Sequence, residues 1–255
     1  MSHFEKFNQL HQQSSPLLLG NIWDVQSAKM FEAAGYQAIG TSSHALAIAN
    51  GYDDGEQLPF ELLLSFAKRV VEVVNIPFTA DIEGGYDRNL KGIIRNIQQL
   101  ADVGVAGINI EDTIPGFPRK LQGMEDFPAV ISAIADHISQ NNLNIFLNVR
   151  TDSFLLGMPD ALQEALKRIK HYENAGARGI FTPCITAAAD IKAVVEATAL
   201  PVNVMCMPGL PDFNELTQLG VKRISMGGFV FSKVCEDAGR LVEKILKDQN
   251  FGSIF

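Results

Sequence analysis

Short apolar runs alternate with longer amphipathic stretches along most of the chain. The apolar runs fall at about residues 17–22, 37–41, 77–81, 106–110, 145–149, 179–182, 201–205 and 222–226. Segments with the apolar spacing of helices separate most of them, at 60–74, 89–103, 127–140, 160–175 and 186–198. This alternation of strand and helix predicts parallel strands that are joined by right-handed crossovers.

Two local signatures recur within this alternation. The first is a helix end, a glycine and a short apolar strand, repeated at Gly35, Gly104, Gly176 and Gly220. A glycine just past a helix can adopt the left-handed conformation that closes the helix. The second is a valine-rich helix end that runs into a proline at Pro77 and again at Pro201. Proline is tolerated at such strand entrances because no N–H is needed there.

Eight such units in about 210 residues predict a (β/α)8 TIM barrel, an α/β fold, as a single domain over residues 1–255. A doubly wound open sheet is the alternative, and it is disfavoured because no GxGxxG or Walker loop follows a strand. Residues 1–15 are expected to form an N-terminal helix against one end of the barrel. Residues 229–248 are expected to form a last helix.

Composition narrows the function classes. The 255 residues are 47% hydrophobic and 20% charged with a net charge of −8, which excludes a disordered chain and disfavours nucleic-acid binding. The apolar runs are too short to cross a bilayer, and no signal peptide is apparent. Three cysteines without a CxxC pair, Cys184, Cys206 and Cys235, fit a reducing compartment. We expect a cytoplasmic protein without nucleic-acid or membrane partners.

Acidic residues follow the strands at the end where barrel enzymes carry their active sites. Asp81 and Glu83 follow the third strand, Glu111 ends the fourth, and Asp53 lies in the loop after the second. If the shared face of Asp81 and Glu83 points inward, these acids converge. Neighbouring carboxylates repel by about 1–4 kcal/mol per pair, and a divalent cation removes that cost. Oxygen ligands alone favour Mg²⁺, with Mn²⁺ also possible, over zinc.

The alternative for each acid is a helix cap or a surface charge, and this interpretation is preferred for Asp54 and Asp112. The internal repeat supports the metal interpretation for the others. When the two strands that begin at prolines are aligned, methionines stand opposite Asp81 and Glu83. The scaffold alone therefore does not require acids at these positions.

Candidate anion-binding groups lie at neighbouring strand ends. Arg150 is placed to clamp a carboxylate or phosphate in bidentate fashion, although a salt bridge to one of the acids is the alternative. The turn Thr41-Ser42-Ser43-His44 offers hydroxyl and backbone N–H groups to an anion, or equally caps a helix. Trp23 is expected to form a wall of the substrate pocket.

These motifs together resemble the isocitrate lyase/phosphoenolpyruvate mutase superfamily, and most closely its short bacterial methylisocitrate lyase-like and carboxyphosphonoenolpyruvate mutase-like branch. The resemblance rests on the motifs at residues 21–24, 39–43, 51–55, 81–86, 107–112 and 148–152. It implies a (β/α)8 barrel with Mg²⁺ at Asp81, assisted by Asp53, Glu83 and Glu111. It also implies dimers or tetramers, commonly with the last helix exchanged between subunits.

The resemblance further implies that the Ser42-Ser43 turn and Arg150 bind the carboxylate of an α-oxo acid or its enolate, and we expect Arg150 and Glu111 to be catalytic. C–C lyases of the superfamily carry Lys-Lys-Cys-Gly-His after the fourth strand, with the cysteine as general acid. Residues 112–122 of this chain contain neither cysteine nor histidine. Arg119 and Lys120 in this segment are candidates for contact with a substrate anion, or are exposed loop charges.

The leading expectation is a Mg²⁺-dependent lyase-type enzyme that cleaves a C–C bond next to a pyruvate or α-oxo acid unit through an enolate. It would be a lyase or an oxaloacetate decarboxylase, assembled as a homodimer or homotetramer. One alternative is a mutase or hydrolase that acts on the P–C bond of a phosphoenolpyruvate-like substrate. The other is a non-catalytic protein that binds α-oxo acids.

Overall fold

Residues 17–22 close a ring of parallel strands. In the computed structural model, which describes residues 1–116 and 118–255, β1 pairs with β11 and β2 pairs with β3, so these two short strands are halves of one barrel strand. The order around the ring is β1-β11-β10-β9-β8-β5-β4-β3-β2. The predicted (β/α)8 barrel is thereby confirmed, and the open sheet is excluded because its two edges meet.

The observed strands lie within a residue or two of the predicted apolar runs. The barrel strands are β1 (Leu17–Leu18), β2 (Gly20–Ile22), β3 (Ile39–Thr41), β4 (Phe78–Asp81), β5 (Gly107–Glu111), β8 (Phe146–Arg150), β9 (Gly179–Phe181), β10 (Val202–Met205) and β11 (Arg223–Ser225). Their residues are almost all buried because a parallel barrel strand is covered on both faces, by the interior and by helices, and polar residues such as Asn109 and Asn148 bond to each other inside. The pairing register places Asp81 beside Asn109, and Glu111 beside Arg150.

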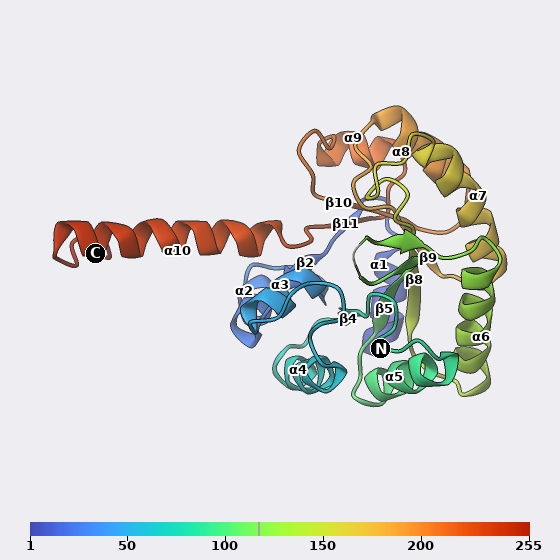
Figure 1. Ribbon diagram of the computed structural model, residues 1–255, viewed down its shortest axis with the longest axis horizontal. Coiled ribbons are helices and arrows are strands. Elements are labelled where there is room, and N and C mark those ends of the chain that lie inside the picture. Colours follow the sequence, from blue (N-terminus) through green and yellow to red (C-terminus); the bar gives the residue numbers. More distant parts are fainter. Residues whose placement is uncertain (117) are drawn as a thin grey trace.

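Helices surround the barrel and cover the outside of its strands (Figure 1). They are α2 (Val25–Ala33), α3 (Ser43–Ala49), α4 (Phe60–Val73), α5 (Leu90–Asp102), α6 (Asp126–Gln140), α7 (Ala161–Asn174), α8 (Ala188–Glu196) and α9 (Phe213–Gln218). Their buried faces and the strands share one large apolar core. None of the described helices is both long enough and apolar enough to cross a membrane.

The amino-terminal helix α1 (His3–Leu10) closes the end of the barrel opposite the carboxyl ends of the strands. It is shorter than the predicted helix over residues 1–15. Ser2 caps it with a capping box, and Phe7 is fully buried against Phe146, with ring centroids 5.6 Å apart. Because α1 covers this end, the carboxyl ends of the strands form the open end of the barrel.

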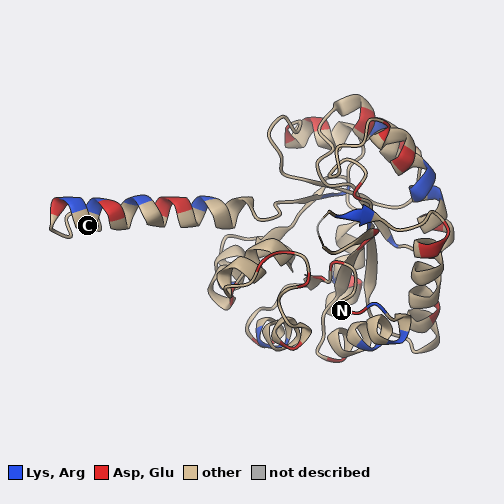
Figure 2. Ribbon diagram, viewed as in Figure 1, with Lys and Arg blue, Asp and Glu red and all other residues tan. Residues whose placement is uncertain are grey.

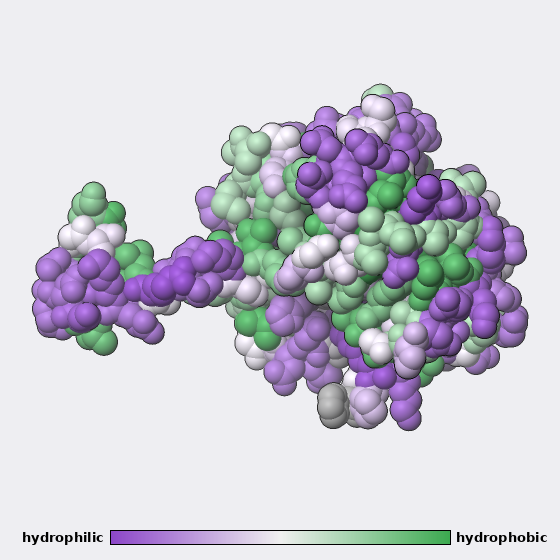
Figure 3. All heavy atoms as spheres, turned by 90° about the horizontal axis from the view of Figure 1, so that it is seen from above, coloured by the Kyte–Doolittle hydropathy of each residue, from purple (hydrophilic) through white to green (hydrophobic). Residues whose placement is uncertain are grey.

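The last helix, α10 (Phe229–Asp248), has the predicted bounds but projects away from the barrel (Figures 1 and 3). Acidic and basic side chains alternate along it (Figure 2), and Lys233 and Arg240 pair with Glu236 and Asp237. Its apolar side chains are largely exposed, among them Val234, Leu241, Val242 and Leu246. A helix in this place normally covers the barrel wall, so α10 leaves a wall segment next to β11 without its own helix.

Two elements at the open end were not predicted. A small antiparallel hairpin of β6 (Thr113–Ile114) and β7 (Lys120–Leu121) lies in the segment after the fourth barrel strand. Helix α3 follows directly on the Thr41–His44 turn, and the Ser42 hydroxyl accepts a hydrogen bond from the Ala45 amide at 3.2 Å. The helix-cap interpretation of that turn is therefore correct. Phe117, in the hairpin segment, lies outside the described residues.

Candidate active site

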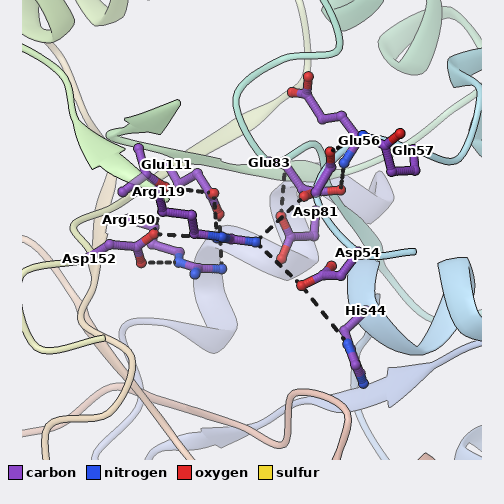
Figure 4. Close-up of polar contacts among 12 residues, drawn as sticks. His44, Asp54, Glu56, Gln57, Asp81, Glu83, Glu111, Arg119, Arg150 and Asp152 are labelled. Carbon is purple, nitrogen blue, oxygen red and sulfur yellow. Dashed lines mark hydrogen bonds and ion pairs between the residues drawn. The ribbon is translucent and has the colours of Figure 1, made fainter. Parts of the chain in front are cut away.

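Three of the predicted metal-binding acids lie buried at adjacent strand ends. Asp81, Glu83 and Glu111 are 8%, 2% and 1% exposed, respectively. Asp81 ends β4, and its backbone amide donates to Thr41 Oγ1 at 2.7 Å. Glu111 ends β5, the next strand of the ring. The three acids therefore lie together at one end of the barrel, as expected, although only Asp81 and Glu111 project from strands (Figure 4).

Glu83 reaches the cluster by a turn and not by strand alternation. The strand ends at Asp81, and Glu83 has φ of +49°, a left-handed conformation that is costly for a residue with a side chain. Its amide donates to Asp81 Oδ1 at 3.1 Å, and its Oε1 accepts from the Glu56 amide at 3.0 Å. Its Oε2 is buried without a hydrogen-bond partner among the described residues.

Arg150 lies beside Glu111 because the two residues are register partners on β8 and β5. Its Nη1 lies 3.0 Å from Glu111 Oε2, and its Nε donates to Asp152 Oδ1 at 2.6 Å. The salt bridge to acids is therefore observed. Arg150 also lines the cavity described below, and its binding of a substrate anion stays a prediction. The buried Asp152 orients the guanidinium, a role that the sequence analysis did not assign.

Arg119 reaches from the hairpin segment into the middle of the acids (Figure 4). Its Nη1 lies 2.9 Å from Glu111 Oε1 and 3.7 Å from Asp152 Oδ2. Its Nη2 lies 3.3 Å from Asp54 Oδ2 and 4.0 Å from Glu83 Oε2. Arg119 is therefore no exposed loop charge but the cationic centre of the cluster.

The structure places Asp54, and not the predicted Asp53, at the cluster. Asp54 pairs with Arg119 and lies 3.9 Å from His44 Nδ1. Asp53 is exposed, has no ion pair among the described residues, and lines a neighbouring hollow together with Asp54 and Arg119. Asp54 was expected to be a helix cap or a surface charge, but the loop instead turns its carboxylate toward Arg119.

A cavity of about 390 Å³ opens in front of these groups. It is lined by Asn21, Thr41, Ser42, Ser43, His44, Asp54, Asp81, Asn109, Arg119, Arg150, Leu155, Leu156, Phe181, Met205, Ser225, Gly227, Gly228 and Phe229. The described lining includes the whole predicted anion-binding turn. It does not include Trp23, whose ring packs instead against Phe231 of α10 with centroids 5.4 Å apart. Trp23 thus supports the root of α10 and not the cavity wall.

Asp112 is neither a helix cap nor a surface charge. It is fully buried, accepts from Tyr172 Oη at 2.7 Å and from the Asp152 amide at 2.9 Å, and lies 3.4 Å from Arg168 Nη1. This network joins the end of β5 to helix α7 and to the segment after β8. It fixes the backbone from which Asp152 and Arg150 project.

The buried carboxylates carry raised pKa values. Burial, followed by the neighbouring acids, raises the pKa of Glu83 to about 9. Burial raises the pKa of Glu111 to about 7, against the opposing charge of Arg150, and it also raises the pKa of Asp81. Burial by itself would lower the pKa of Arg150, but the surrounding carboxylates raise it well above its usual value. The site is therefore short of positive charge.

The donor set fits a hard divalent cation in part. Five carboxylates, those of Asp54, Asp81, Glu83, Glu111 and Asp152, face two guanidinium groups, which leaves three negative charges in excess when all five are ionised. The unpartnered Glu83 Oε2 is a free oxygen donor. Among residues 1–116 and 118–255, no three acidic, histidine or cysteine side chains are arranged to ligate one ion together. The arrangement suits an ion held by one or two carboxylates and by water.

Several site residues escaped the sequence analysis because no local pattern marks them. Asn21 is one: its Oδ1 accepts from the Met226 amide at 2.6 Å, and its Nδ2 donates to the Thr41 carbonyl at 3.1 Å. These two hydrogen bonds join β2 to β3 and to the residue after β11, at a position that lines the cavity. Phe181 and Met205 line the cavity from β9 and β10. Their position at strand ends was the only available signal.

The chain matches the phosphoenolpyruvate phosphomutase family over residues 7–246 and belongs to this family. An uncharacterized protein of Mycobacterium tuberculosis is 32% identical over 226 residues, which are 89% of this chain and 83% of that protein. The oxaloacetate decarboxylase of Paraburkholderia xenovorans is 27% identical, with 93% and 81% of the two chains covered. The resemblance seen in the sequence motifs is thereby confirmed.

Solved structures agree with this placement. A candidate phosphonomutase from Burkholderia cenocepacia superposes with a TM-score of 0.89 at 34% identity, over 94% of this chain and 99% of that one. A phosphonopyruvate hydrolase in complex with oxalate and Mg²⁺ superposes with a TM-score of 0.87 at 21% identity, over 100% and 90% of the two chains. The protein is therefore an enzyme of a superfamily of C–C and P–C lyases and mutases.

Proposed function

We propose that the protein is a Mg²⁺-dependent lyase that breaks a C–C bond next to the pyruvate unit of a small α-oxo acid, with oxaloacetate as the first substrate to test. The observation that carries the proposal is the cavity of about 390 Å³ in which Asp81, Asp54 and Arg150 face the same space, with Glu111 paired to Arg150 behind it. Curated relatives include oxaloacetate decarboxylases and 2-methylisocitrate lyases. These names support the class of reaction.

Arg150 is the proposed ligand of the substrate carboxylate. Asp152 and Glu111 hold its Nε and Nη1, so the guanidinium is fixed in one orientation at the cavity wall. A planar, fixed guanidinium suits bidentate binding of a carboxylate. The Ser43 and His44 end of the turn lines the opposite side and is the proposed contact for the rest of the substrate.

Asp81, Glu83, Glu111 and Asp54 are the proposed holders of the divalent ion, directly or through water. When bound there, the ion supplies positive charge that stabilises the enolate left by bond cleavage. The mostly buried position of the three strand-end acids strengthens such interactions because little water screens them. Glu111 also orients Arg150, which is the catalytic role that we propose for it.

The residues after β5 suit decarboxylation better than they suit a cleavage that needs a general acid from this segment. Residues 112–122 contain neither cysteine nor histidine. When the C4 carboxylate of oxaloacetate leaves as CO₂, the bonding electrons move to C3 and form the enolate of pyruvate. That enolate then takes its proton at C3 from water. No protein acid is required at the step in which the bond breaks.

The test is turnover by the purified protein with Mg²⁺. Oxaloacetate, 2-methylisocitrate, 2,3-dimethylmalate and phosphonopyruvate are offered separately, and pyruvate is measured against a protein-free Mg²⁺ control. We expect pyruvate from oxaloacetate and a loss of about 100-fold or more in kcat/KM for Arg150→Lys and Asp81→Asn. Turnover of phosphonopyruvate alone would support the P–C alternative. No turnover of any substrate would support the non-catalytic alternative and overturn the proposal.

Asp53 and Asp54 provide a matched pair for the same assay. They are adjacent in sequence, but only Asp54 lies at the cluster. We expect Asp54→Asn to raise the Mg²⁺ concentration needed for half-maximal rate, and Asp53→Asn to leave it unchanged. The opposite result would restore the assignment made from sequence.

We also propose a homodimer or homotetramer in which α10 of one subunit covers the barrel wall of another. The exposed apolar residues of α10 support this arrangement, as does an apolar cavity of about 300 Å³ beside β11. The proposed location is the cytoplasm, which is supported by the three free cysteines, two of them exposed.

A further inference from the structure

The hairpin β6–β7 is attached to the site mainly through charges. Arg119, next to Lys120 of β7, places its guanidinium within 4.0 Å of four carboxylates, those of Asp54, Glu83, Glu111 and Asp152. The hairpin itself is short, with two residues in each strand, and Ile114, Gly116, Pro118 and Lys120 are exposed. The described apolar core contains none of these residues.

The base of the hairpin has three further polar anchors among the described residues. Arg168 Nη2 donates to the Gln122 carbonyl at 3.1 Å. The Gln122 amide donates to the Asp112 carbonyl at 2.8 Å. Thr113 Oγ1 lies 2.8 Å from Glu111 Oε1 and 2.7 Å from Asp152 Oδ2, and its single proton can serve only one of them at a time. Arg119 is thus the group that ties the outer part of the hairpin to the barrel.

Arg119 and a divalent cation require the same oxygens. Three of its four carboxylate partners, those of Asp54, Glu83 and Glu111, are proposed holders of the ion. The buried and unpartnered Glu83 Oε2 points toward Arg119 at 4.0 Å and so is available to either cation. A guanidinium and a divalent ion within a few ångströms of each other in a half-buried site repel strongly.

We propose that Arg119 is a tethered cation that alternates with the divalent ion on these carboxylates, so that binding of the ion releases the hairpin β6–β7. The inference rests on the metal site of the proposed function. It adds that Arg119 competes with the ion for the carboxylates of that site. Because Arg119 also lines the cavity, its position controls access to the cavity. Binding of the ion and opening of the hairpin are then one coupled equilibrium.

The first test measures Mn²⁺ affinity by calorimetry or by the free-Mn²⁺ signal in electron paramagnetic resonance, without any substrate. Arg119→Gln removes the competitor, and Lys120→Gln removes the same charge from the neighbouring exposed position. We expect the Mn²⁺ dissociation constant to fall by about tenfold in Arg119→Gln, within the usual range of such couplings, and to stay within about twofold of wild type in Lys120→Gln, whose charge is screened by solvent. Equal affinities in wild type and Arg119→Gln would overturn the inference.

The second test follows hydrogen exchange of the amides in residues 113–116 and 118–122, with and without Mn²⁺. We expect Mn²⁺ to speed exchange in wild type, and exchange to be fast in Arg119→Gln even before Mn²⁺ is added. Unchanged or slower exchange in wild type on Mn²⁺ binding would show that the ion enters with Arg119 in place, which overturns the release. Thermal unfolding checks that both variants are folded, and Arg119→Lys, which keeps the charge, should behave like wild type in affinity.

The two proposals fail in different ways. If no variant binds Mn²⁺, the metal site of the proposed function is wrong, and this inference falls with it. If all variants bind Mn²⁺ equally, the metal site stands and only the competition is wrong. Neither readout depends on turnover.

Discussion

At the scale of single residues, the site concentrates unfavourable features in Glu83. Its backbone is left-handed at φ of +49°, its Oε2 is buried without a partner among the described residues, and its pKa is raised to about 9. Each of these costs stability, and such strain clusters where function requires a fixed geometry. The strained backbone and buried carboxylate of Glu83 lower the stability of the fold but keep this acid beside Asp81 and Glu111.

The pH dependence of stability follows from Glu83. The pKa of Glu83 in the folded state lies above its ordinary value. The contribution of Glu83 to the free energy of unfolding is therefore fully present below about pH 4.5 and is lost as the pH rises toward 9. With a chelator present, we expect the Tm of wild type to fall more steeply between pH 6 and pH 9 than that of Glu83→Gln. At pH 9 we expect the variant to melt roughly 5 °C higher, which corresponds to about 1–2 kcal/mol in a domain of this size.

Two comparisons keep this prediction specific. At pH 5 the two proteins should melt at nearly the same temperature, because Glu83 is protonated in the folded wild type. Glu196→Gln, a substitution of an exposed glutamate, should leave the slope of Tm against pH unchanged. A Glu83→Gln variant that follows wild type across the whole range would contradict the raised pKa.

At the scale of elements, the strand ends are held by links between neighbours in the ring. Register pairing brings Glu111 and Arg150 together without any contact that is local in sequence. Asp112, one residue beyond β5, then anchors helix α7, which follows β8, through Tyr172 and Arg168. The strand register positions Glu111 and Arg150, the proposed catalytic groups, and the buried network holds the strand ends in place.

This network can be tested by substitution at Asp112. Asp112→Ala leaves Arg168 without one partner in a buried place, and we expect a loss of about 3 kcal/mol in the free energy of unfolding by urea. Tyr172→Phe removes one hydrogen bond to a charged acceptor and should cost about 1.5–3 kcal/mol. Glu72→Gln breaks an exposed ion pair with Arg69 and should change little. Equal stability of Asp112→Ala and wild type would show that the network is not a structural link.

At the scale of the whole molecule, α10 is the element that the single chain leaves incomplete. It stands away from the barrel (Figure 3), and its apolar side chains are largely exposed, while residues beside β11 and α9 line an apolar cavity. A contiguous exposed apolar surface of this kind marks a protein interface. The site lies next to the root of α10, since Gly228 and Phe229 line its cavity.

Assembly can be tested with two substitutions far from the cavity. We expect the wild type to elute as a dimer or tetramer in size-exclusion chromatography with light scattering. Val242→Glu combined with Leu246→Glu should shift it toward monomer, because both side chains are more than 60% exposed in the single chain and would be buried by a partner. Glu243→Gln on the same turn is the control. A monomeric wild type, or an unaffected double variant, would contradict the exchange.

The local pattern of the chain was enough for the scaffold. The bounds of strands and of most helices followed from apolar runs, helix-ending glycines and the two prolines, since a barrel strand covered on both faces is rich in apolar residues. Asp81 and Glu111 followed from the rule that barrel sites lie at strand ends, and the structure brings both to the cluster.

The placement of side chains in loops could not be predicted in this way. Asp53 and Asp54 are alike in sequence, and only the path of the loop decides that Asp54 faces the acids. Trp23 was expected at the cavity, yet it packs under α10, a helix about 200 residues away along the chain.

Sequence alone thus determined the ring of strands and which of its ends carries chemistry, because these depend on periodicity and on residue type at neighbouring positions. Only the tertiary structure decided that Arg119 lies among four carboxylates, that Asp112 is a buried link and that α10 stands free. Those outcomes depend on distances between segments far apart in the chain, and the strength of charge–charge contacts is set by that separation and by burial.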